Sequence, residues 1–79
     1  MYKFFIAEIN NNIRTVMTYE MVEQEYGIKR EQFKIDVKNL ISSGHVKSFY
    51  ECETQNTELY KAILNKDIIT VNELLEENK

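Results

Sequence analysis

Residues 21–37 read MVEQEYGIKREQFKIDV, and this stretch decides which fold the sequence predicts. Its single glycine, Gly27, separates two segments of helical composition and is one of only two glycines in the chain. Glycine adopts without steric cost the left-handed backbone conformation that ends many helices. We therefore expect a first helix with Thr18 as its N-cap, an end at Tyr26 and a sharp turn at Gly27.

A second helix is expected directly after this turn, and Gly44, the other glycine, is expected to end it. Ile28 and Phe33 have the spacing of a hydrophobic staple around a cap at Lys29, which fixes the angle at which a helix begins. Lysine carries no acceptor for the first-turn amides, so this cap is an unusual one. The expected buried face consists of Phe33, Val37, Leu40 and Ile41, and the expected outward face of Lys29, Arg30, Gln32, Lys34 and Lys38.

Charge is distributed unevenly along the chain. The 79 residues contain 10 Lys and Arg against 13 Asp and Glu, a net charge of −3. Residues 29–38 nevertheless hold four cations and only two carboxylates, so their local charge is +2 and the remainder carries −5. A protein that binds nucleic acid over its whole surface is normally basic, so the sequence points instead to one positive helix on an acidic body.

Strands are expected on both sides of the helix pair. Residues 2–9 and 13–18 are rich in aromatic and β-branched residues and flank three asparagines, which predicts a hairpin. Residues 46–52 and 58–64 are expected to form a second hairpin around a turn at 54–57. Thr70 and Glu73 have capping-box spacing, and Ile69 is placed to staple Leu74, so a short helix should close the chain. A chain of this length forms one domain, residues 1–79.

The run MVEQEYGIKREQFKIDVKNLISSGHV (21–46) resembles the helix-turn-helix of bacterial and phage winged-helix transcription regulators. Residues 23–28 match the first helix and turn of that family, and Gly44 and Val46 match the exit from its second helix. The matching residues of the second helix itself are Arg30, Glu31, Phe33, Asp36, Val37 and Leu40. The resemblance implies a small α+β winged helix-turn-helix domain in which the hairpin at 46–64 is the wing.

DNA binding is the function that this pattern favours, because the second helix of such a pair fits the major groove. Arg30 suits guanine, Gln32 suits adenine and Ile35 suits a thymine methyl group. The phosphate backbone would be contacted by Lys29, Lys34 and Lys38. We expect a transcriptional regulator that binds double-stranded DNA as a homodimer, since small domains often depend on a second copy.

An alternative reading uses the acidic remainder of the chain. Small acidic proteins of phages and mobile elements often bind a host protein, for example a nuclease, and block its nucleic-acid channel. Here Glu51, Glu53 and Glu58 of the expected wing would provide the acidic surface. No motif of the anti-CRISPR proteins is visible, so this hypothesis depends on charge and size alone.

Other functional classes find little support in the sequence. His45 is expected on the surface and Cys52 in an inward-facing strand position, where its neighbouring carboxylates disfavour a thiolate. The sequence offers no metal cluster with sensible spacing, no glycine-rich phosphate loop and no catalytic constellation, so we expect neither an enzyme nor a cofactor. The longest apolar run, FFIA at 4–7, is far too short to span a membrane, and the expected compartment is the cytoplasm. The Asn-, Ile- and Lys-rich composition suggests an AT-rich genome such as that of a phage.

Overall fold

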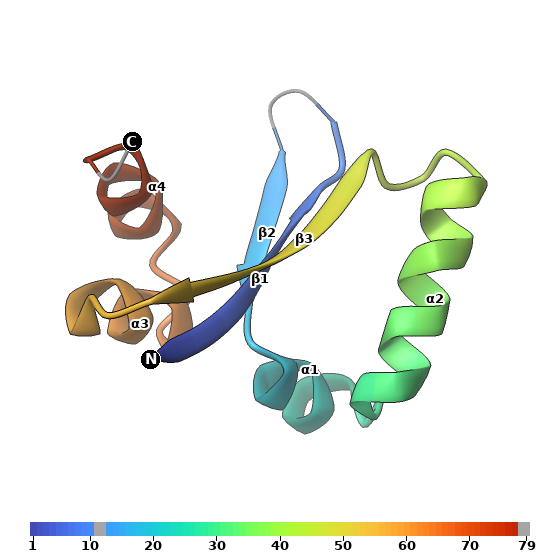
Figure 1. Cartoon of the computed structure of the whole chain (residues 1–79), viewed down its shortest axis with the longest axis horizontal. Helices are drawn as coiled ribbons and strands as arrows, with labels where there is room; N and C mark the ends of the chain where they lie inside the picture. Colours follow the sequence, from blue (N-terminus) through green and yellow to red (C-terminus); the bar gives the residue numbers. More distant parts are fainter. Residues whose placement is uncertain (11–12, 78–79) are drawn as a thin grey trace.

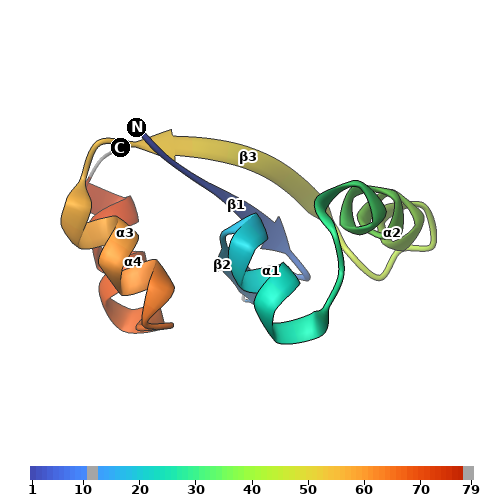
Figure 2. The same ribbon diagram turned by 90° about the horizontal axis from the view of Figure 1, so that it is seen from below.

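The computed structural model describes residues 1–10 and 13–77 of the chain. Its elements are β1 (Tyr2–Glu8), β2 (Arg14–Met17), α1 (Tyr19–Tyr26), α2 (Arg30–Ser42), β3 (Ser48–Thr54), α3 (Thr57–Leu64) and α4 (Ile68–Glu77). The strands form one antiparallel sheet in the order β2–β1–β3. Helices α3 and α4 lie on one side of this sheet and α2 on the other (Figure 1 and Figure 2). The predicted α+β class is confirmed.

The N-terminal hairpin is present as the sequence predicts. Strands β1 and β2 pair antiparallel, from Phe5 opposite Met17 to Glu8 opposite Arg14. The amide of Ile13 donates a 3.1 Å hydrogen bond to the side chain of Asn10 at the start of the connection. The other two asparagines of the predicted turn lie outside the described residues.

Strand β1 is buried on both faces because it is the central strand of a sheet covered by helices on both sides. Side chains alternate between the two faces of a strand. Phe4 and Ile6 therefore point into the main core with α3 and α4, while Phe5 points toward α2. On that second face the ring of Phe5 lies 5.1 Å from Phe33 of α2, 5.1 Å from Phe49 of β3 and 5.4 Å from Tyr19 of α1.

Helix α1 has the predicted cap and the predicted end. The side chain of Thr18, fully buried, accepts a 3.1 Å hydrogen bond from the amide of Met21. Gly27 has φ +68 in the left-handed region, and its amide donates to the carbonyl of Glu23. The cap, the helix and the turn at Gly27 are therefore confirmed.

Helix α2 begins where the sequence predicts and ends slightly earlier. Lys29 occupies the N-cap position and makes no side-chain cap hydrogen bond, as its chemistry requires. The helix ends at Ser42, two residues before Gly44, whose φ of +82 lets the chain turn toward β3. The amides of His45 and Val46 both donate to the carbonyl of Leu40 and close this helix end.

The predicted wing hairpin is wrong. Strand β3 forms near the predicted position, but it pairs with β1 along its whole length, from Tyr2 opposite Thr54 to Glu8 opposite Ser48. Residues 58–64, predicted as a strand, belong to helix α3. The sequence of this segment contains two signals for a helix. Asn56 is a suitable N-cap, and in the structure its side chain accepts a 3.2 Å hydrogen bond from the amide of Leu59. The apolar residues of the segment also have helical spacing. Those of them that are buried are Leu59, Ala62 and Ile63.

The predicted C-terminal helix exists, but it begins before the expected capping box. Asp67 accepts hydrogen bonds from both the amide and the hydroxyl of Thr70, at 3.2 and 2.7 Å. Thr70 is thus inside the first turn of α4 instead of at its cap. Ile69 is 73% exposed, whereas Leu74 packs against the core of the same chain, so the expected staple between them does not form.

Replacement of Ile63 by Val tests the orientation of α3. Ile63 is 1% exposed, so loss of one methylene should lower the free energy of unfolding by about 0.5–1.5 kcal/mol. Ile69→Val removes the same group from a side chain that is 73% exposed and should change the stability by less than about 0.5 kcal/mol. Urea unfolding of both variants measures the difference. Equal effects would contradict the burial of this α3 face.

Candidate nucleic-acid interface

Helix α2 stands at one end of the molecule, away from α3 and α4 (Figure 1 and Figure 2). Only Val37 of its thirteen residues is buried. The short connection from Gly27 to Lys29 joins it to α1, so the two helices form the predicted helix-turn-helix sequence of elements. All six residues predicted to contact DNA are exposed on α2 or at its cap: Lys29, Arg30, Gln32, Lys34, Ile35 and Lys38.

The buried face of α2 is narrower than predicted. Phe33 packs edge-on against Phe49 at 6.0 Å and beside Phe5, and Val37 is 6% exposed. Leu40 and Ile41, which were predicted to be buried, are 41% and 40% exposed. The prediction fails for them because the aromatic side chains that cover α2 contact it at Phe33, two turns earlier.

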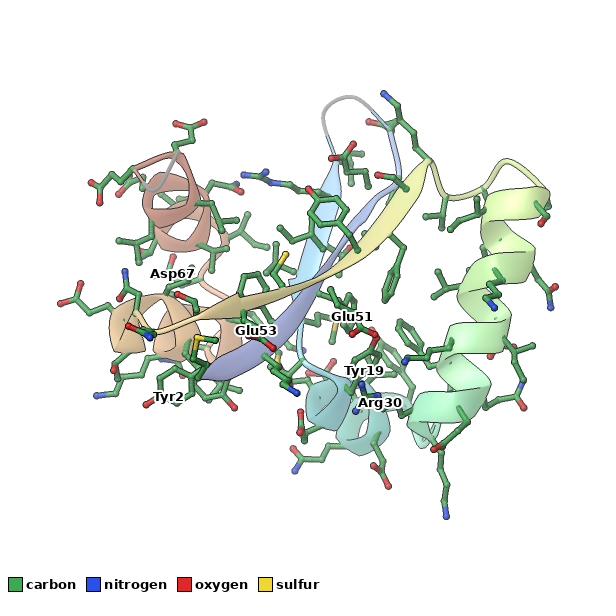
Figure 3. The ribbon with its side chains drawn as sticks, in the orientation of Figure 1. Tyr2, Tyr19, Arg30, Glu51, Glu53 and Asp67 are labelled. Carbon is green, nitrogen blue, oxygen red and sulfur yellow. The ribbon has the colours of Figure 1, made fainter. Side chains whose placement is uncertain are left out.

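Arg30 and Lys34 point away from the predicted outward face. The guanidinium carbon of Arg30 lies 4.5 Å from the centre of the Tyr19 ring, and the Lys34 ammonium lies 5.8 Å from the same ring. The Lys34 Nζ atom is 3.2 Å from Oε1 of Glu51 on β3. Figure 3 shows Tyr19, Arg30 and Glu51 gathered between α1, α2 and the sheet. We call Tyr19, Arg30, Lys34 and Glu51 the Tyr19 cluster.

Helical geometry explains this placement. An α-helix turns by about 100° per residue, so positions 30, 34 and 37 lie on neighbouring sides of the helix. Arg30 and Lys34 therefore lie next to Val37, both on the same side of it, and turn toward the body of the protein. The prediction from the sequence separated apolar from basic residues and assigned all four cations of 29–38 to the face opposite the apolar one. The spacing of four between Arg30 and Lys34, next to Val37, was the signal for the correct placement.

Tyr19 and Glu51 are coupled by a short hydrogen bond. The Tyr19 hydroxyl donates to Oε1 of Glu51 at 2.5 Å, on the same oxygen that Lys34 approaches. Burial of the ring, followed by the hydrogen bond and the charge of Glu51, raises the pKa of Tyr19 to about 12. The hydrogen bond from Tyr19 and then that from Lys34 hold the pKa of Glu51 below its usual value. Glu51 is therefore ionised near neutral pH and Tyr19 is neutral.

The outward face of α2 retains a smaller set of side chains. Gln32 donates a 2.9 Å hydrogen bond to Asp36 across one helical turn. Ile35 is 54% exposed. The side chains of Lys29 and Lys38 have no ion-pair or hydrogen-bond partner in the described part of the chain. Polar, apolar and cationic groups thus alternate along the exposed side of the helix.

The three acidic residues of the alternative hypothesis do not share a wing. Glu51 and Glu53 lie on β3, and Glu51 is engaged by Tyr19 and Lys34. Glu58 lies in the first turn of α3, where a carboxylate is favourable next to the positive end of the helix dipole. Glu51 is therefore not available to a partner without loss of its internal contacts.

The remaining reactive side chains occupy the expected positions. His45 is exposed, and its Nδ1 lies 2.7 Å from the Ser43 hydroxyl. Cys52 packs against the core, and burial raises the pKa of its thiol, which lowers the fraction of reactive thiolate. Within residues 1–10 and 13–77, no group of three or more His, Cys, Asp or Glu side chains is placed to hold a metal ion.

An open hollow of about 540 Å³ lies beside β2 and α4. Arg14 crosses it and donates two hydrogen bonds, of 3.0 and 2.7 Å, to the side-chain oxygen of Asn72. These bonds tie β2 to α4, so Arg14 has a clear structural role there. Ile68 and Glu76 contribute further to the walls.

Comparison of the chain with protein families, with characterised proteins and with solved structures finds no match. None of the helices in the described ranges has the length and apolar character needed to cross a bilayer.

Glu51→Gln should lower the pKa of Tyr19 from about 12 toward that of an ordinary tyrosine, because two of the causes of the shift come from Glu51. Because folding raises this pKa, the contribution of Tyr19 to stability should decline as the pH rises from about 10 to about 12. The deprotonation of Tyr19 is followed by the absorbance of tyrosinate as the pH is raised, in the parent, in Glu51→Gln and in Tyr19→Phe. The late step that Tyr19→Phe lacks belongs to Tyr19. An unchanged late step in Glu51→Gln would show that Glu51 has no part in it.

Proposed function

We propose that this chain binds double-stranded DNA through the outward side of α2, as a small helix-turn-helix regulator of transcription. One observation carries the proposal. A thirteen-residue helix, joined to its predecessor by a left-handed glycine turn, has a single buried residue, Val37, and its opposite side is exposed.

The dimensions of α2 suit the major groove. Thirteen residues at 1.5 Å each give a helix of about 20 Å, a little more than half a turn of B-DNA. The major groove is about 12 Å wide and admits an α-helix with its side chains. Since α2 lies at one end of the molecule, α3 and α4 stay clear of a duplex that approaches from that end (Figure 2).

The exposed side chains suggest separate roles. Gln32 is suited to adenine and Ile35 to a thymine methyl group. To contact adenine, the Gln32 side chain gives up its exposed hydrogen bond to Asp36 and forms hydrogen bonds to the base instead. Lys29 and Lys38 are suited to phosphates on the two sides of the groove. Arg30 stacks on Tyr19, so we assign it to the DNA backbone and not to a guanine.

The proposal retains the helix-turn-helix part of the winged-helix resemblance and omits the wing, whose place is taken by α3. Lys29, Arg30 and Lys38 are few phosphate contacts, so a single copy gains little from the release of counterions. Two copies on neighbouring half-sites double these contacts, which favours a homodimer on DNA.

The alternative, inhibition of a host protein through the acidic residues, has weaker support because Glu51 is engaged internally. It predicts that a host protein is captured from lysate even after nuclease treatment. It also predicts that this capture is lost when Glu53 and Glu58 are replaced by Gln. DNA binding predicts that neither replacement weakens the complex.

Lys38→Ala should weaken binding to duplex DNA and reduce the slope of log K against log salt by about 0.9 per copy, the value of one phosphate contact. The matched control is Lys61→Ala, which removes the same exposed charge from α3 on the other side of the sheet. Fluorescence anisotropy with a labelled duplex at several salt concentrations measures both.

Equal slopes for Lys38→Ala and Lys61→Ala would rule out a specific role for α2. Failure of the parent chain to bind any duplex from a random pool at low salt would rule out the proposed function as a whole.

A further inference from the structure

The Tyr19 cluster has the composition of an anion-binding site. A hydroxyl from α1 and an ammonium from α2 contact a carboxylate from β3, and a guanidinium from α2 lies over the ring that carries the hydroxyl (Figure 3). The donors come from the same two helices that form the helix-turn-helix. The anion is supplied by the chain itself, so the donor set is already arranged around a negative charge.

The contacts within the cluster centre on one oxygen atom. Oε1 of Glu51 accepts from the Tyr19 hydroxyl at 2.5 Å and lies 3.2 Å from the Lys34 ammonium. Arg30 is held above the Tyr19 ring at 4.5 Å, and its charge also acts on Glu51. One hydroxyl donor, one ammonium and one guanidinium are the groups that proteins commonly use for a phosphate.

The site is open to a ligand from solution. The side chains of Lys34 and Glu51 are 44% and 48% exposed. Ion pairs at such exposure contribute little net free energy, because water competes with both partners. A phosphate carries its negative charge on oxygens that can take the place of the Glu51 carboxylate, so exchange of one anion for the other is physically reasonable.

The position of the cluster relative to α2 matches the DNA backbone. Position 34 lies about 100° around the helix from position 35, so when Ile35 faces the bases Lys34 faces the side of the groove. In helix-turn-helix complexes the first helix crosses the phosphate backbone, and Tyr19 is the first residue of α1. A duplex docked in this way would bring a backbone phosphate close to the cluster.

We propose that Tyr19, Arg30 and Lys34 form a phosphate-binding site that the Glu51 carboxylate occupies in the unbound protein and that a DNA phosphate takes over on binding. This inference rests on the proposed DNA binding and adds three residues to it, Tyr19 and Lys34 as ligands and Glu51 as an internal competitor. Glu51 lowers the affinity for every duplex equally, since a phosphate carries no sequence information.

Glu51→Gln provides the test, because it keeps the shape of the side chain and removes the competing charge. Its affinity for duplex DNA should rise by about fivefold, the factor that corresponds to about 1 kcal/mol for a half-exposed ion pair. Glu53→Gln is the matched control, since it removes the same charge from the same strand, two residues away. Affinity that rises equally in the two variants would overturn the inference, because only net charge would then matter.

Tyr19→Phe, combined with Glu51→Gln, tests the hydroxyl as a phosphate ligand. Phenylalanine keeps the ring packed beside Phe5 and removes only the donor, so the gain in affinity should be largely lost. A double variant that binds DNA as tightly as Glu51→Gln would exclude Tyr19 from the site. Circular dichroism of each variant verifies that the fold is retained.

Inorganic phosphate separates this inference from the proposed function. In Glu51→Gln, titration with phosphate should give saturable NMR shifts at Tyr19, Arg30 and Lys34, and Glu53→Gln should give none there. If the parent chain binds no duplex but these shifts occur, the phosphate site stands and the proposed function fails. If DNA is bound and the shifts and the gain in affinity are both absent, the function stands and the site is refuted.

Discussion

Burial of β1 on both faces is the constraint on which the rest of the structure depends. Four consecutive residues, Phe4 to Ala7, are at most 9% exposed, so each face of the sheet must be covered by other elements. Phe4 and Ile6 require α3 and α4, and Phe5 requires the aromatic rings around α2. A 79-residue chain that buries a strand in this way uses its helices as two outer layers, and α2 is the layer with the fewest internal contacts to satisfy.

The local features were predictable because short-range chemistry determines them. Thr18 can accept from a free amide of α1, Gly27 can take φ +68, and the aromatic and β-branched residues of 2–8 suit a strand. Each of these depends only on residues within about four positions in the sequence. The helix-turn-helix order of elements and the exposure of α2 followed from them.

Pairing between distant segments was not predictable in the same way. Residues 46–64 suggested a local hairpin, but β3 pairs with β1, forty or more residues earlier in the chain. That choice depends on the unpaired edge of β1, which only the folded sheet presents. Once β3 occupies this edge, residues 57–64 form a helix, and Leu59 and Ile63 cover Phe4 and Ile6. The error in the wing therefore comes from one non-local strand pairing.

The charges of α2 illustrate the same limit at the level of the site. In the sequence, the basic residues of 29–38 and the acidic residues of 51–58 supported two competing functions. In the structure they meet, because Lys34 and Glu51 are 3.2 Å apart and share Tyr19 as a neighbour. Glu51 therefore bears on the two hypotheses in opposite ways. An acidic surface for a protein partner needs its carboxylate to be accessible, whereas the proposed phosphate site at Tyr19 and Lys34 needs that carboxylate to be displaced.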